Sequence, residues 1–119
     1  MAYHEVVNDV VGGVPIALVF CPLCDSISVF DRRVDGAALE FGVSGLLHDS
    51  NVLMYDRRDD ALWSQLELRA ISGPLANRTL THLSGWSIAS FDAWRDAHPD
   101  GRVATFETGV DRPYDRLPY

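Results

Sequence analysis

Two cysteines separated by two residues, in Cys21-Pro22-Leu23-Cys24, are the part of this sequence best suited to chemistry. Such a pair lets two sulfurs meet in a disulfide, and it equally lets two thiolates face one metal ion. It can also do neither, since cysteines pack well as small apolar residues in a core. Three interpretations therefore stay open: thiol–disulfide chemistry, metal binding, and a non-catalytic binding or scaffold domain.

The residues that follow the pair weaken the first interpretation. In thioredoxin-like sites a helix begins at the cysteines, and its N-terminus lowers the pKa of the first thiol. Here the segment from Ser26 to Phe30 alternates polar and apolar residues, which is the period of a half-buried strand. We therefore expect a strand after Cys24, and a thiol–disulfide oxidoreductase using Cys21 and Cys24 is the alternative interpretation.

Metal binding is the interpretation that the residue types favour. A Cys-Pro-x-Cys turn between strands resembles the knuckle of zinc ribbons and rubredoxins, but a structural zinc site needs four protein ligands. Beyond Cys21 and Cys24, ligands would have to come from carboxylates or from His4, His48, His82, His98 or Met54. Two thiolates with an imidazole suit Cu(I), so copper is preferred over zinc. An incomplete ligand set would leave a position open for small-molecule chemistry.

A hairpin count selects His4 from the histidines. The segments Val6–Val11 and Val14–Phe20 are separated by Gly12-Gly13, a pair that supplies the positive φ of a tight turn. Residues equidistant from such a turn face each other, and His4 and Cys21 are equidistant from this one. The predicted metal ligands are therefore Cys21, Cys24 and His4.

The remaining candidates have simpler interpretations. His48 lies in a polar loop and is expected to be solvated. His98 follows a predicted helix, whose C-terminus favours imidazolium without any ligand role. Met54 has apolar neighbours and is expected in the core.

The elements that must position these residues are mostly strands. Their connections are too short for parallel crossovers, so we expect a mainly β fold, all-β or α+β, with an antiparallel sheet of about six strands. Ser90 is suited to cap one short helix that ends near His98. A last strand is expected at Val103–Phe106. With no linker or repeat, residues 1–119 are expected to form a single domain.

Composition bounds the partners. The chain has 119 residues, 47% of them hydrophobic, and a formal net charge of −7. Such a charge repels phosphate backbones, so no nucleic-acid partner is expected, whereas a small molecule or a metal donor is compatible with it. The longest apolar stretch is too short to span a bilayer. The sequence as written begins with no signal peptide, so as written it is expected to be cytoplasmic, but the sequence leaves the native location unknown.

A series of motifs resembles a large bacterial and archaeal family that is catalogued as a domain of unknown function, with members often exported. The matching blocks lie at residues 4–9, 21–24, 41–47, 54–57, 62–65, 98–101 and 112–114. The resemblance implies a shared fold but no function. It places His4, Cys21 and Cys24 within motif blocks. Similar proteins usually carry more sequence before the His-Glu motif, often with an export signal.

Overall fold

The chain divides into two compact units, Met1–Ser84 and Gly85–Tyr119. The computed structural model describes residues 3–116. The expectation of a single domain over residues 1–119 stays a prediction.

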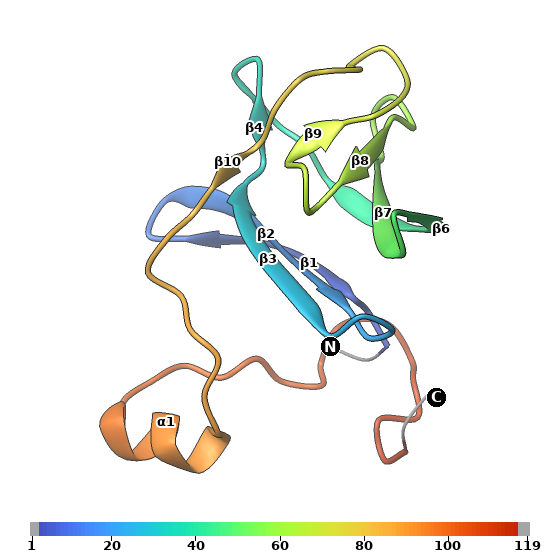
Figure 1. The fold of residues 1–119 in the computed structure, drawn as a ribbon. Coiled ribbons are helices and arrows are strands. Elements are labelled where there is room, and N and C mark those ends of the chain that lie inside the picture. Colours follow the sequence, from blue (N-terminus) through green and yellow to red (C-terminus); the bar gives the residue numbers. More distant parts are fainter. Residues whose placement is uncertain (1–2, 117–119) are drawn as a thin grey trace. The chain divides into compact units, whose positions relative to one another are not determined.

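The first unit contains two four-stranded antiparallel sheets and a two-stranded ribbon (Figure 1). The first sheet has the order β1-β2-β3-β10, with strands at Val6–Val11, Val14–Cys21, Ser26–Asp31 and Thr81–His82. The second has the order β6-β7-β8-β9, with strands at Phe41–His48, Asn51–Asp56, Leu62–Ser64 and Arg69–Ala70. The ribbon pairs β4 with β5, at Arg33–Val34 and Ala37–Ala38.

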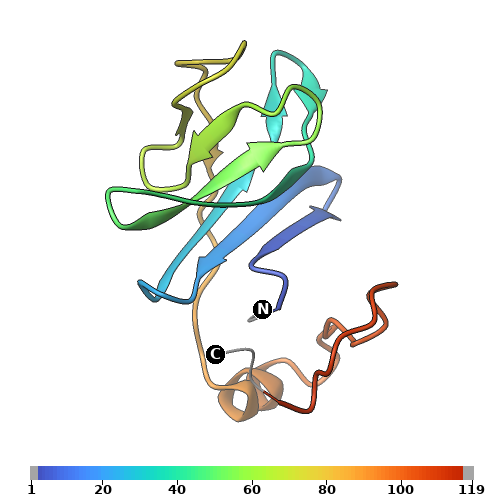
Figure 2. The ribbon, with the colours of Figure 1, turned by 90° about the vertical axis from the view of Figure 1, so that its right-hand side faces the viewer.

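The predicted fold class is confirmed, but the strands are arranged differently from the expectation. Strands pair antiparallel throughout the described residues, in two sheets instead of one sheet of about six strands. The ribbon β4–β5 lies along the chain between the two sheets (Figure 2). A strand's sequence pattern reports which face is buried and not which sheet it joins, so this division was not predictable from periodicity.

The first hairpin has the register that its glycines predict. Val11 pairs with Val14 and Val6 with Val19, across Gly12 and Gly13. Gly12 has φ 58° and Gly13 has φ 81°, the left-handed values that a two-residue hairpin turn requires.

The core of the first unit joins its two sheets. Phe30 on β3 packs edge-to-face against Phe41 on β6, with ring centroids 5.5 Å apart. Phe41 in turn meets Trp63 on β8 in the same geometry at 5.6 Å. All three side chains are buried, and such T-shaped pairs are the favoured contacts between aromatic rings. The three aromatic rings therefore hold the sheet in which Cys21 ends β2 against the sheet that contains β8.

A second link between the sheets is polar. The Asn8 side chain on β1 donates to the Phe41 carbonyl at 2.9 Å and accepts from the Phe41 N–H at 2.8 Å. One amide thus satisfies both backbone groups of a buried residue, which would otherwise cost free energy. Asn8 therefore has a structural role of its own within the motif block at residues 4–9, separate from any ligand role of His4.

The second unit contains the predicted helix, α1, at Phe91–Ala97. Ser90 caps it by accepting a hydrogen bond from the Ala93 N–H, and the His98 N–H donates to the Trp94 carbonyl. The strand expected at Val103–Phe106 does not form, and the prediction is wrong. That segment pairs with no other in the described residues, and an isolated extended segment has no ladder to stabilise it.

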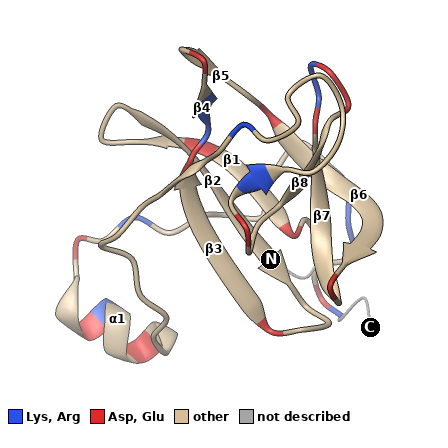
Figure 3. Ribbon diagram, turned by 45° about the horizontal axis from the view of Figure 1, so that its top comes forward, with Lys and Arg blue, Asp and Glu red and all other residues tan. Residues whose placement is uncertain are grey.

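The charged residues are interspersed in the described part of the chain. In α1 the basic Arg95 lies between Asp92 and Asp96, and acidic residues occupy turns and strand ends of the first unit (Figure 3). Between residues 3 and 116, no helix combines the length and the apolar character that a membrane crossing needs.

Candidate functional site

Three tight turns supply the polar residues around the cysteines. The turn at residues 21–26 joins β2 to β3, the turn at 48–51 joins β6 to β7, and the turn at 64–69 joins β8 to β9. The first belongs to one sheet and the other two belong to the other sheet. Side-chain hydrogen bonds connect all three turns, so the site depends on the packing of the two sheets.

The two cysteines form a disulfide within the first turn. Cys21 ends β2 and is buried, with 1% of its surface exposed, whereas Cys24 is exposed in the turn. Strand β3 begins at Ser26, and no helix begins at the pair. The predicted strand after the cysteines is therefore confirmed. The site lacks the helix N-terminus that lowers a thiol pKa in thioredoxin-like proteins.

Asn51 connects the second turn to the first. Its side-chain amide donates to the Cys24 sulfur at 3.0 Å and to the Ser26 hydroxyl at 2.9 Å. Asn51 is 5% exposed, so a buried amide reaches a sulfur and a hydroxyl that are partly open to solvent.

Gln65 connects the third turn to the other two. Its amide nitrogen donates to the Ser26 hydroxyl at 3.1 Å and to the Asn51 side-chain carbonyl. Gln65 is 1% exposed, and its own Oε1 atom has no hydrogen-bond partner. Buried polar atoms are normally paired, so an unpaired one has to be explained by what the rest of the side chain does.

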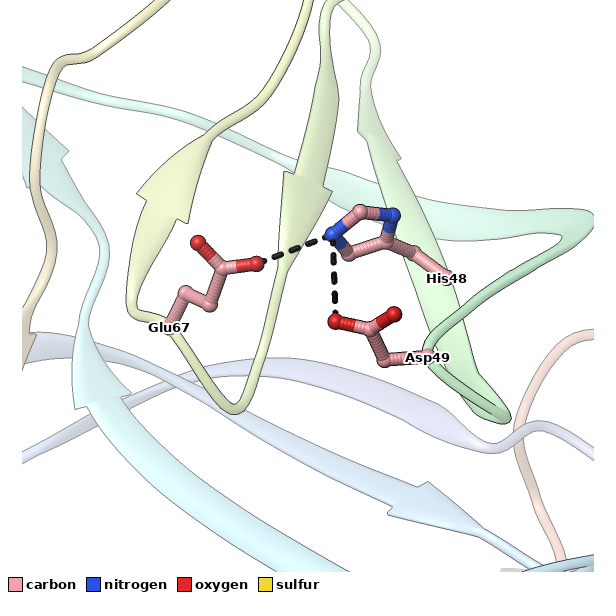
Figure 4. Close-up of side chains that lie close together, drawn as sticks. All are labelled: His48, Asp49 and Glu67. Carbon is pink, nitrogen blue, oxygen red and sulfur yellow. Dashed lines mark hydrogen bonds and ion pairs between the residues drawn. The ribbon is translucent and has the colours of Figure 1, made fainter.

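A second polar cluster lies on two of these turns, the turn at residues 48–51 and the turn at residues 64–69. His48 Nε2 is 2.9 Å from Glu67 Oε1 and 3.7 Å from Asp49 Oδ2 (Figure 4). One ligand atom from each residue lies within 4.8 Å of the others, a spacing that could hold a metal ion. The sequence predicted a solvated His48. In the structure its side chain is partly exposed but paired with Glu67.

Glu67 is held by two neighbours. The Arg69 guanidinium donates to Glu67 Oε2 at 2.6 Å and is the main reason that the pKa of the Glu67 carboxyl is lowered. Desolvation is the next-largest influence and opposes this shift, and the hydrogen bond from His48 lowers the same pKa by a smaller amount. Glu67 therefore stays ionised, with His48 on one carboxylate oxygen and Arg69 on the other. Because both oxygens already have partners, the cluster is better described as an ion-pair network than as a metal site.

His4 lies just before β1. The Phe20 N–H donates to the Glu5 carbonyl at 2.7 Å, so pairing continues one residue beyond the strand. Glu5 has φ 54°, however, so the chain leaves the extended conformation between His4 and Val6. The alternation of faces that placed His4 beside Cys21 assumed an extended chain. A ligand role for His4 stays a prediction.

The other sequence candidates lie elsewhere. Met54 is fully buried in the core, as expected. His82 is on β10, and His98 is the residue that ends α1 in the second unit.

Sequence reasoning missed the residues that contact the cysteines across the sheets. Asn51 is the first residue of the buried strand β7 and Gln65 directly follows the short strand β8, places where a buried amide is unusual. That local contrast was the only available signal. The contacts themselves join positions 25 to 39 residues apart, so spacing could not reveal them.

Comparison with known proteins identifies the family. A family model described as "Protein of unknown function (DUF3179)" matches residues 1–119, and the chain belongs to that family. The resemblance drawn from the motif blocks is confirmed at the level of the family. No curated protein and no solved structure matches the chain.

Proposed function

We propose that this DUF3179 domain is a thiol–disulfide exchange module, in which Cys24 is the reacting sulfur and Cys21 the resolving sulfur. The observation that carries the proposal is the unequal exposure of the two bonded sulfurs, with Cys21 buried and Cys24 exposed. Exchange proceeds by attack of a thiolate on a disulfide sulfur, which requires access to one sulfur of the pair.

The reaction needs only a thiol or disulfide partner. In the reduced domain, the Cys24 thiolate attacks one sulfur of a partner disulfide and releases the other as a thiolate that takes up a proton. Cys21 then loses its proton and attacks the Cys24 sulfur, which releases the second partner thiol. The partner disulfide is thereby reduced by two electrons, and the domain is oxidised by two.

A purely structural role explains the pair less well. The disulfide joins residues separated by 3 positions, within a turn that the β2–β3 ladder already closes. In the chain-entropy model, a crosslink over so short a loop contributes only about 2 kcal/mol. That is the lower end of the usual range for a disulfide, and the scaffold alternative does not explain why one sulfur is exposed beside a buried one, an arrangement that suits exchange.

Single-cysteine variants test the proposal. Cys21→Ser leaves the exposed Cys24 thiol, which we expect to form a mixed disulfide with oxidised glutathione about tenfold faster than Cys21 does in Cys24→Ser. The measurement is the rate of appearance of the glutathione adduct by mass spectrometry. Equal rates in the two folded variants would contradict the assignment, and no adduct in either would contradict exchange itself.

Binding of Cu(I) by the reduced pair is the second candidate. Both sulfurs lie on one turn, so the same geometry that forms the disulfide brings two thiolates together after reduction. Cu(I) is suited to two or three soft ligands, whereas structural zinc requires four. We propose His4 as a third ligand because the Phe20 N–H donates to the Glu5 carbonyl, which keeps the residue after His4 beside the end of β2. The left-handed φ of Glu5 removes the argument from alternating faces, so the proposal rests on this proximity alone.

A further inference from the structure

The absence of a helix at the cysteines raises the question of what stabilises a thiolate there. We propose that Asn51 and Ser26 form a donor pair for the Cys24 thiolate, held in orientation by Gln65, and that these positioning residues set the redox equilibrium of the disulfide. This inference rests on the proposed exchange function. It assigns the stabilisation of the thiolate, which a helix N-terminus provides in thioredoxin-like sites, to three side chains.

The Asn51 amide is the first donor. Its nitrogen lies 3.0 Å from the Cys24 sulfur. An N–H group donates more strongly to a thiolate than to the weakly accepting sulfur of a disulfide, because hydrogen bonds to ionised acceptors are about twice as strong as neutral ones. The contact therefore stabilises the reduced state more than the oxidised state.

The Ser26 hydroxyl is the second donor. Its oxygen accepts from both the Asn51 and the Gln65 amides, so its own hydrogen is left to donate elsewhere. The Cys24 sulfur lies 3.5 Å away and carries no hydrogen in the disulfide, which makes Ser26 the donor of this contact. Two donors thus converge on the exposed sulfur of the pair.

Gln65 fixes the direction of the Asn51 amide. It donates to the Asn51 carbonyl oxygen, so the Asn51 nitrogen must face Cys24 and Ser26. A reversed Gln65 would set its Oε1 against that oxygen and would favour a reversed Asn51 with no donor toward sulfur. In the observed orientation Gln65 Oε1 is buried without a partner. Gln65 directs both amide hydrogens to Ser26 and Asn51, and this orientation leaves its Oε1 without a hydrogen bond. Unpaired buried polar atoms of this kind are found at functional sites.

The test is the equilibrium of each variant with glutathione. Asn51→Asp keeps the shape of the side chain but replaces the donor by an acceptor, and Ser26→Ala removes the second donor. We expect the equilibrium constant for oxidation by glutathione disulfide to rise about tenfold in Asn51→Asp, equal to about 30 mV, and severalfold in Ser26→Ala. Ser44→Ala is the matched control, because it also removes a part-buried serine hydroxyl, which donates to the Leu53 carbonyl at 2.7 Å and not to sulfur or to the network around it.

The outcomes separate this inference from the proposed function. A wild-type domain that never exchanges with glutathione contradicts the function itself. A wild-type domain that exchanges, with constants in Asn51→Asp and Ser26→Ala within twofold of it, overturns the donor pair alone. A shift in Ser44→Ala as large as that in Ser26→Ala also overturns it, since loss of any serine hydroxyl in this unit would then have the same effect. If Asn51→Asp fails to fold, Ser26→Ala and its control decide the matter.

Discussion

At the scale of single residues, the site depends on the difference between Cys21 and Cys24. The two sulfurs are bonded, yet one side chain belongs to the core and the other to the surface. The sequence predicted that these residues carry the chemistry, because a Cys-x-x-Cys pair is visible at short range. It could not assign different roles to them, since burial of Cys21 follows from packing of β2 against the rest of the core.

Copper binding makes a prediction at the same scale. The reduced protein is expected to bind about one Cu(I), and Cys21→Ser/Cys24→Ser should lose it, because thiolates are the soft ligands. His4→Ala should weaken binding less, since an imidazole is one ligand among several. Competition with a Cu(I) chelator measures the affinity, with circular dichroism as the control for folding. Equal affinity in the wild type and the double variant would exclude the thiolates as ligands.

At the scale of elements, the turns were predictable and their meeting was not. Gly12-Gly13 specifies its hairpin register locally, and the alternation from Ser26 specifies β3. The network that surrounds Cys24 needs the β2–β3, β6–β7 and β8–β9 turns at one place. That meeting follows from the core between the sheets, in particular from Phe30, Phe41 and Trp63, and no local pattern encodes it.

The ion pair between the β8–β9 turn and Arg69 predicts a pH dependence. Because the folded pKa of Glu67 is lowered from 4.5, its contribution to stability is present above that value and is lost as the pH falls through the folded pKa. Arg69→Gln should therefore reduce the loss of stability between about pH 5 and pH 3. Urea unfolding at several pH values measures this, with Arg102→Gln as a control for net charge. The same pH dependence in Arg69→Gln and wild type would show that Arg69 does not hold Glu67.

At the scale of the whole molecule, the first unit presents a disulfide at a surface turn and supports it from the opposite sheet. The hydrogen bonds around Cys24 join residues between 24 and 65, all within the first unit. The acidic composition and the exposed Cys24 suit a small thiol or an accessible partner disulfide, not a nucleic acid.

The most direct test of the account is the reversibility of the Cys21–Cys24 disulfide in the intact chain. The protein is equilibrated in glutathione buffers of graded potential, and the dithiol fraction is counted by alkylation and mass spectrometry. We predict a single two-electron transition above about −300 mV, since structural disulfides lie below that potential. A pair that stays oxidised throughout the glutathione range would be structural, and a pair that never oxidises would contradict the exchange function.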